Sequence, residues 1–267
     1  MSLYKDEAIV LFKRAFGESD KIIRLFTHKS GKIAAIAKGG SKSQKRFMNT
    51  LELFNCINVE YFEKTGKGLV RLENAYILEA NHGIEENIKK VCTAGFFTEL
   101  VDRLTKERER HDELFYLLKD ILKTLKQAEF NYTDIVYNHM KILETLGFMP
   151  NLTECVYCGN KMDVEEKVCF SSEKGGVLCR ACSSALPHKT YNEGVIERIL
   201  LFCKGRGERD YRLTDRVMDE GISSKKESKG YVFLERQIQD IMEGFMSYHL
   251  DVELRSYSLL KRYVFKQ

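Results

Sequence analysis

The sequence predicts a multidomain α+β protein, in which a small N-terminal β-barrel precedes a helical region that carries an inserted metal module. Three observations lead to this prediction. Strand-sized apolar runs fill the first part of the chain, apolar residues recur at helical spacing beyond them, and two C-x-x-C pairs interrupt the helical pattern. The predicted domains are residues 1–80 and 81–267, with the module inserted at 151–188.

The N-terminal part reads as five short β-branched and apolar segments separated by turn residues. The segments are residues 8–12, 22–27, 33–37, 55–62 and 69–78. Five strands of this length within about 80 residues favour a small, closed antiparallel barrel. An SH3-like barrel or a small sandwich would give a similar pattern, so the sequence leaves the exact barrel type open at this point.

After Gly83 the apolar period becomes helical. The stripes are Leu114, Leu118, Ile121, Leu122 and Leu125; Val136, Met140, Leu143 and Leu146; Ile196, Ile199, Leu200 and Cys203; and Ile238, Ile241, Met242, Phe245 and His249. We expect each stripe to face the core, although a stripe left uncovered would form a groove for a partner peptide. Residues 204–230 mix eight basic and six acidic side chains with Gly and Ser, which predicts a solvated loop.

The cysteines predict a metal site. Cys155 and Cys158 form one C-x-x-C pair, Cys179 and Cys182 form another, and twenty residues separate the pairs. Two such knuckles supply four thiolates, which suits one structural Zn²⁺ per chain because no coordination position is left open for water or substrate. Four ordinary buried thiols, or an iron–sulfur cluster, are the alternatives.

The remaining Cys and His residues are unpaired in sequence. Cys169 and His188 are near enough to the two pairs to substitute as ligands, but neither has a paired neighbour. We expect Cys169 to be a packing residue, together with Cys56, Cys92 and Cys203.

Composition excludes several protein classes. The longest apolar runs are strand-sized, whereas a membrane-spanning helix needs roughly 18 apolar residues, so no membrane span is expected. Charged residues flank the first apolar run, which excludes a secretory signal and favours a cytoplasmic protein with reduced thiols. The net charge, +4 from 43 basic and 39 acidic residues, is too small to identify a partner by itself.

The charge is unevenly distributed along the chain. Residues 1–80 carry 14 basic and 9 acidic side chains, and no acidic residue lies between Asp20 and Glu52. The basic residues of this interval, which form the candidate nucleic-acid site, are Lys21, Arg24, Lys29, Lys32, Lys38, Lys42, Lys45 and Arg46. Such a run is often only a solvated face, but the small residues at 39–43 would let main-chain N–H groups approach phosphates. Phe26, Phe47 and Phe54 are candidate base-stacking residues, of which at least one is expected in the core.

No catalytic constellation is found in the sequence. The segment around Gly39 and Lys42 does not fit a Walker A motif, G-x-S-x-G and H-E-x-x-H are absent, and the six His residues are scattered. We therefore expect a non-enzymatic protein without a small-molecule substrate. The rival interpretations are a protein–protein adaptor that uses the barrel and the zinc module for docking, and a nuclease.

The order of several short motifs resembles the bacterial RecO family of recombination mediators. The motifs are G-E-x-D at 17–20, L-F-T at 25–27, A-K-G at 37–39, T-E-L at 98–100, L-G-F-x-P at 146–150 before C-x-x-C-G, and G-G-x-L-C-x-x-C at 175–182. Each motif is weak alone, but the ordered set covers about two thirds of the chain. Some family members lack the zinc cysteines, whereas all four are present here.

The resemblance implies an N-terminal OB-fold and a helical domain with a zinc-ribbon-like insertion. It also implies binding of single- and double-stranded DNA, annealing of complementary strands, and action with RecR to help RecA displace single-stranded DNA-binding protein in the RecF pathway. The acidic C-terminal tail of that protein is a further implied partner, and no residues here can be matched to its pocket. These implications predict a cytoplasmic protein that joins the nucleoid when it binds DNA.

Overall fold

A computed structural model describes residues 2–43, 45–63, 68–162, 167–204, 225–249 and 254–265. Its chain divides into two compact units. Unit 1 comprises residues 1–130 with 254–267, and unit 2 comprises residues 131–253. This division falls inside the helical region rather than at residue 80, because helices α1, α2 and α8 group with the N-terminal strands. Within the described residues, no helix combines the length and apolar character needed to cross a membrane.

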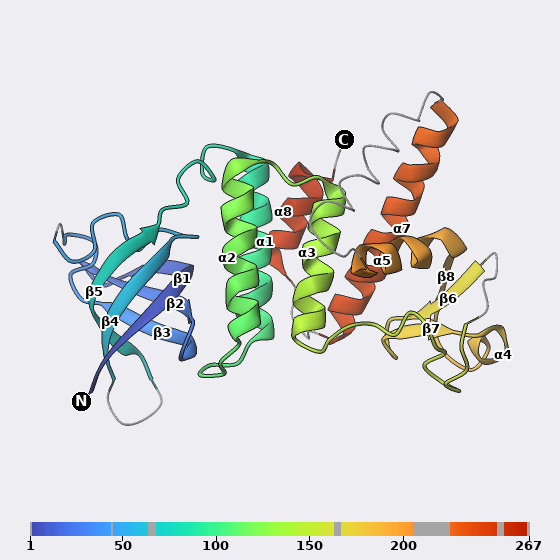
Figure 1. Cartoon of the computed structure of the whole chain (residues 1–267), viewed down its shortest axis with the longest axis horizontal. Helices are drawn as coiled ribbons and strands as arrows, with labels where there is room; N and C mark the ends of the chain where they lie inside the picture. The colour runs from blue at the N-terminus through green and yellow to red at the C-terminus, as the bar shows by residue number, and fades with distance from the viewer. Residues whose placement is uncertain are drawn as a thin grey trace. The chain divides into compact units, whose positions relative to one another are not determined.

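Unit 1 begins with five strands that close into a barrel (Figure 1). The strands are β1 (Ser2–Phe16), β2 (Asp20–Thr27), β3 (Gly31–Ala37), β4 (Cys56–Glu63) and β5 (Val70–Glu79). Their order around the barrel is β1-β2-β3-β5-β4, with β1 pairing antiparallel to β4 and β3 pairing parallel to β5. A five-stranded barrel with a Greek-key connection is the OB-fold, so the predicted barrel is confirmed, although its β3–β5 pair is parallel and not antiparallel as expected.

The barrel interior follows the period-two pattern of its strands. In β3, Ile33, Ala35 and Ala37 are buried, and the residues between them are partly exposed. The barrel core is formed by Ala8, Val10, Ile23, Leu25, Ile33, Ala35, Ala37, Phe47, Leu51, Ile57, Val59, Tyr61, Val70, Leu72 and Ala75. Because alternate residues of each strand enter this core, the side chains between them point out of the barrel.

Three helices complete unit 1: α1 (Ile88–Leu104), α2 (Asp112–Gln127) and α8 (Arg255–Tyr263). All five members of the stripe predicted over 114–125 are buried in α2, so this stripe faces the core as expected. Helix α8 packs along α1, where the ring of Tyr257 lies 5.6 Å from that of Phe96. The Glu99 carboxylate of α1 accepts hydrogen bonds from the main-chain N–H of Arg255 and of Ser256, and so caps the N-terminus of α8.

Unit 2 combines helices with a small sheet. Its elements are α3 (Tyr132–Thr145), β6 (Lys167–Ser171), β7 (Gly176–Leu178), α4 (Arg180–Ser183), β8 (Lys189–Asn192), α5 (Glu193–Lys204) and α7 (Lys225–His249). The three strands form an antiparallel sheet of order β7-β6-β8. The sheet is fixed to α7 because the Asp240 carboxylate accepts hydrogen bonds from Tyr191 (2.6 Å) and Lys189 (2.7 Å).

Most members of the predicted stripes of unit 2 face inward where the structure describes them, but Leu146 and Leu200 are partly exposed and His249, predicted to end the last stripe, is exposed. Val136, Met140 and Leu143 are buried, as are Ile196 and Ile199, and Ile238, Ile241, Met242 and Phe245. The buried members of these stripes are therefore core residues and do not form the partner groove considered as an alternative. The loop predicted over 204–230 lies mostly outside the described residues, and its end is wrong, because α7 already begins at Lys225.

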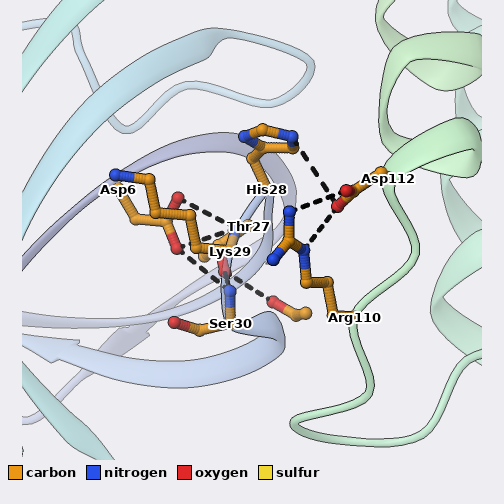
Figure 2. A network of polar contacts seen from close by, with 8 residues as sticks. Asp6, Thr27, His28, Lys29, Ser30, Arg110 and Asp112 are labelled. Carbon is orange, nitrogen blue, oxygen red and sulfur yellow. Dashed lines mark hydrogen bonds and ion pairs between the residues drawn. The ribbon is translucent and has the colours of Figure 1, made fainter.

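The hairpin between β2 and β3 is held from two sides, and Figure 2 shows the contacts of Asp6 on one of them. The buried Asp6 carboxylate accepts hydrogen bonds from the main-chain N–H groups of Lys29 and Ser30, each at 3.1 Å. On the other side, the connection from α1 to α2 runs along β3, and the N–H of Arg108 donates to the carbonyl of Lys32 at 3.0 Å. A main-chain hydrogen bond therefore links the barrel directly to the connection between α1 and α2.

Gly31 makes this close approach possible. It has φ +66°, and a Cβ at this position would lie 2.0 Å from the carbonyl oxygen of Glu109. We expect Gly31→Ala to lower the free energy of unfolding by more than the 1–2 kcal/mol, roughly, that a left-handed backbone costs an L-residue. Urea unfolding would measure it. Gly17→Ala is the matched control, since Gly17 has φ +61° with open space around it. Equal losses in the two variants would contradict the backbone contact.

Candidate nucleic-acid interface and metal centre

The loop after β3 presents basic side chains at one end of the barrel. Asp20 organises the loop, because its carboxylate accepts hydrogen bonds from the Lys38 ammonium at 2.6 Å and from the Gly39 N–H at 2.8 Å. Both hydrogen bonds lower the pKa of Asp20, that from Lys38 more. The Arg46 guanidinium donates to the Lys38 carbonyl at 2.7 Å and lies over the Phe47 ring. Lys38 and Arg46 are thereby held in place by the loop itself.

Lys42 and Lys45 complete this end of the barrel. Both side chains are exposed, and neither has an ion pair among the described residues. Lys21 lies beside the loop, since it pairs in register with Ala37, and its ammonium is 4.0 Å from the Glu52 carboxylate. We call the surface formed by these five residues the basic barrel end: Lys21, Lys38, Lys42, Lys45 and Arg46. It is the part of the predicted site that the structure brings together.

The prediction that main-chain N–H groups of this loop contact phosphates is wrong. The N–H of Gly40 bonds the Ala37 carbonyl, that of Ser41 bonds the Ser19 carbonyl, and those of Lys42 and Ser43 both bond the Gly39 carbonyl. With the Gly39 N–H held by Asp20, every main-chain donor from 39 to 43 is used inside the protein. Phosphate contacts from this part of the loop must therefore come from side chains.

Arg24 and Lys32 do not lie on a common surface with the basic barrel end. Both turn toward α1, where the Arg24 guanidinium is 2.6 Å from the Asp102 carboxylate. The Lys32 side chain is only 12% exposed, and its ammonium donates to the carbonyls of Asp102 and Thr105 at the end of α1. Burial lowers the pKa of Lys32, although Asp102 opposes this. These two cations cap and fix a helix, and their buried partners leave them unavailable to a phosphate.

Lys29 is exposed but lies elsewhere on the barrel. It belongs to the hairpin before β3, whereas Lys38 follows β3 at its other end. The seven residues of β3 separate the two lysines by roughly 20 Å. The eight basic residues of the sequence interval therefore form no continuous track.

The predicted stacking residues are all buried. Phe26 is 0% exposed, Phe47 3% and Phe54 8%, so none presents a ring face to solvent. The exposed aromatic residue nearest in sequence to the β1–β2 turn is Phe16, at 46%. Phe16 is the last residue of β1. Its position directly before the turn residue Gly17 could have indicated from the sequence that its side chain lies at the end of the barrel.

The four cysteines meet in unit 2, as predicted. Their Sγ atoms all lie within 4.8 Å of one another, and those of Cys158 and Cys179 are 3.8 Å apart. A disulfide would need about 2.05 Å, whereas tetrahedral thiolates at a metal–sulfur distance of about 2.3 Å lie about 3.8 Å apart. This geometry fits a metal ion held by four sulfurs.

Local structure explains how the four sulfurs are presented. Cys155 and Cys158 lie on a tight turn, in which the Gly159 N–H donates to the Cys155 carbonyl at 2.8 Å. Gly159 has φ +74°, which agrees with the turn expected at this position. Cys179 directly precedes the short helix α4, and Cys182 lies within it.

The thiol chemistry also favours a cation. Burial raises the pKa of Cys155, but hydrogen bonds from the main chain of Cys179, Cys158 and Tyr157 outweigh it and lower the pKa to about 6. The pKa of Cys182 is instead raised to about 12, first by its hydrogen bond with Cys179, then by burial, and least by the neighbouring charge of Cys158. Each thiolate that forms therefore makes ionisation of the next cysteine less favourable, and a divalent cation would offset this repulsion between negative charges.

The other candidate ligands stay outside this cluster. Among the described residues, the cluster contains only the two cysteine pairs. His188 faces the Leu186 carbonyl through Nδ1 at 3.0 Å, and Cys169 lies on β6 near Thr190. Cys56 and Cys92 are buried in unit 1, in agreement with a packing role, and the side chain of Cys203 lies outside the described residues.

Comparison with known proteins gives consistent matches. A family model described as Recombination protein O N terminal matches residues 1–81, and one described as Recombination protein O C terminal matches residues 85–194. The DNA repair protein RecO of Thermoanaerobacter sp. (strain X514) is 29% identical over 258 residues, which are 96% of each chain. The protein of the same name from Anaeromyxobacter sp. (strain Fw109-5) is 33% identical over 177 residues, which are 66% of this chain and 69% of that one. The protein of that name from Anaeromyxobacter dehalogenans (strain 2CP-C) is 31% identical over 187 residues, which are 70% and 73%.

Proposed function

This chain belongs to the RecO family and has a role in DNA repair and recombination, and from that premise we propose that it is a non-enzymatic mediator that binds single- and double-stranded DNA and anneals complementary strands. The observation that carries the proposal is the basic barrel end on an OB-fold barrel. OB-folds bind single strands through a basic surface that follows the phosphate backbone.

The proposed mechanism is electrostatic. Two complementary strands repel each other because each carries one charge per phosphate. A surface of lysine and arginine side chains neutralises part of this charge, which lowers the barrier to pairing without forming or breaking covalent bonds. Lys42 and Lys45 contribute most, because their charges are not paired within the described residues, and Lys21, Lys38 and Arg46 extend the surface around them.

The proposed partners follow from the family resemblance. We assign to this chain the role of helping RecA load onto DNA that is coated with single-stranded DNA-binding protein. Its partners in this role would be RecR and the C-terminal tail of the coating protein. We name no residues for these two protein contacts. Since the substrate is chromosomal DNA, the protein acts at the nucleoid.

The cysteine cluster is proposed to hold one structural zinc ion. Four thiolates match the tetrahedral preference of Zn²⁺ and leave no position for a reacting water. The ion would fix the turn at Cys155–Gly159 to the end of β7, and so would complete the small core that buries Phe170, Val177 and Tyr191.

The decisive experiment is strand annealing by the purified, nucleic-acid-free protein, with and without single-stranded DNA-binding protein. We expect annealing without ATP that weakens as salt rises. If the five residues of the basic barrel end each contact one phosphate, the logarithm of the affinity for single strands falls with a slope of roughly −3.5. That slope is about a hundredfold loss between 50 and 200 mM salt.

Two outcomes of this experiment would reject the proposal. Affinity that does not respond to salt would contradict the electrostatic mechanism, and a protein that retains no DNA would favour an adaptor that binds only proteins. Cleavage of the labelled strands with added Mg²⁺, copurifying with the chain, would revive the nuclease interpretation.

A further inference from the structure

The C-terminal segment is a second basic region of the sequence. Residues 254–267 contain four basic and no acidic side chains, so this short segment carries as much net positive charge as the whole chain. The basic residues are Arg255, Lys261, Arg262 and Lys266. Lys266 lies outside the described residues, and the other three belong to α8.

Helix α8 is amphipathic, with one buried apolar face and one exposed face that carries arginines. Tyr257 and Leu260 are buried, 8% and 0% exposed, and face α1. Arg255, Leu259 and Arg262 recur at the i, i+4, i+7 spacing that places side chains on one face of a helix. All three are exposed, and Tyr263 follows them on the same face at 39% exposure. We call this row the α8 stripe: Arg255, Leu259, Arg262 and Tyr263.

The α8 stripe carries two guanidinium groups, those of Arg255 and Arg262. Neither guanidinium has an ion pair among the residues that the structure describes. Arg262 instead lies over the ring of Tyr263, 5.4 Å from its centroid. This arrangement contrasts with Arg24 and Lys32, whose charges are taken up by Asp102.

The stripe is held in a fixed position. Glu99 caps the helix from α1, accepting the Ser256 N–H at 2.8 Å and the Ser256 hydroxyl at 2.5 Å. Tyr257 and Leu260 anchor the opposite face in the core of unit 1. Because α8 is fixed on both counts, its two arginines project from one exposed face of a helix that is held in place.

We propose that the α8 stripe is a second nucleic-acid site, which binds the phosphate backbone of a DNA strand separately from the basic barrel end. Seven helical residues place Arg255 and Arg262 roughly 10 Å apart along the axis, which is about three steps of a stacked strand. Arginine suits phosphates because its planar guanidinium binds two oxygens at once. The partly exposed ring of Tyr263 would offer a stacking surface to an unstacked base next to such a phosphate.

The stripe fits a nucleic acid better than it fits an acidic peptide. Arginine clusters can also recognise acidic motifs, but peptide helices and strands place their side chains in apolar grooves or pair along free sheet edges. The exposed apolar side chains of the stripe are one leucine and one tyrosine on a convex helix face, and the dominant feature is paired positive charge. Charge complementarity therefore points to a polyanion that is contacted mainly through its backbone.

This site adds something to the proposed function, on which it rests. A protein that anneals strands gains from holding two of them, and one chain with two separated basic surfaces can do so. The basic barrel end would hold one strand, and the α8 stripe the other. Each surface would then be needed for bridging, although a single strand could still bind to either one.

The test is a bridging assay with the full-length chain. Protein bound to an immobilised oligothymidylate is washed and offered a labelled, non-complementary strand. The key variant is Arg255→Gln with Arg262→Gln, which keeps good helix-forming residues on α8. The matched control is Lys123→Gln with Arg236→Gln, which removes the same charge from exposed helix positions that have no ion pairs among the described residues.

We expect the α8 variant to keep binding the first strand but to lose most capture of the second, at least tenfold against the control variant. Its unfolding temperature should equal that of the control, because the changed side chains are exposed. Bridging at the wild-type level would overturn the proposal, and so would an α8 variant that keeps bridging but loses binding to a labelled acidic peptide. If the unaltered protein binds no DNA at all, it is the proposed function that fails.

Discussion

Replacing Lys42 and Lys45 together by Glu is expected to weaken binding of single-stranded DNA at the basic barrel end by roughly 25-fold or more at 0.1 M salt. Each phosphate contact to a single strand contributes about 0.7 to the salt slope, hence about 0.7 decade of affinity at that salt concentration. Two lost contacts then give about 1.4 decades, and the introduced negative charges add repulsion. The salt slope should fall from roughly −3.5 to about −2.1.

This double variant is cleaner than reversal of all four loop cations. Lys38 holds the Asp20 carboxylate, and Arg46 holds the Lys38 carbonyl, so reversing either one would disturb the loop itself. Lys42 and Lys45 are exposed and have no such contact among the described residues. A loss of affinity in their variant therefore reports on DNA contact and not on loop folding.

Fluorescence anisotropy across a salt series would measure the effect. The matched control is Lys123→Glu with Arg236→Glu, which makes the same change in net charge on α2 and α7. If the two variants lose equal affinity, the barrel end acts only through the overall charge of the protein. If neither loses affinity, the assignment of the basic barrel end is wrong.

Replacing Cys155 and Cys179 by Ser is expected to remove the metal and unfold the module they hold. The unaltered protein should contain about one equivalent of zinc by elemental analysis, and the variant should contain none. The apparent binding free energy of structural zinc in small modules is about 10–16 kcal/mol, which is more than a small module gains from its own core. The two changed cysteines belong to different pairs, so each pair loses a ligand.

Hydrogen exchange would locate the effect. We expect faster exchange over residues 151–192 in the variant, and unchanged exchange in the barrel core of unit 1, since that core shares no residue with the module. Cys169→Ser is the control, because Cys169 lies on β6 outside the cluster and should leave the metal in place. Full zinc content in the double variant would disprove the four-sulfur site. DNA affinity that falls while the module stays folded would place the module at the DNA surface.

Local patterns were sufficient to predict the main elements. All five strand segments are confirmed, because a short β-branched and apolar run bounded by turn residues is a property of each segment alone. The α2 stripe is confirmed for the same reason at period 3.6. The cysteine cluster is also confirmed as a set of four, since the C-x-x-C spacing already places two sulfurs on one turn.

The sequence could not predict which of the basic residues form ion pairs inside the protein and which face solvent. Arg24 and Lys38 look alike in an acid-free interval, but Arg24 meets Asp102, whose position lies far along the chain. The same holds for Gly39 to Ser43, whose N–H groups are consumed by contacts with Ser19, Asp20 and the loop itself. Long-range partners of this kind leave no signal in a local pattern.

The residues of the α8 stripe can be recognised in the sequence, but the sequence does not show that they share one exposed surface. The acid-free C-terminal segment can be counted directly, and its i, i+4, i+7 spacing is visible. Its significance depends on Glu99 and the core of α1, which decide that this helix face is outward and fixed. Without that packing, the segment is only a short basic helix.

The sequence by itself determined the strands of the barrel, the stripe of α2 and the two C-x-x-C pairs, because each depends on residues a few positions apart. The tertiary structure alone decided which cations face solvent, which aromatic rings lie in the core, and that α1, α2 and α8 share a compact unit with the barrel. The physical reason is that burial and ion pairing are set by partners from distant parts of the chain, and only the folded protein brings those partners together.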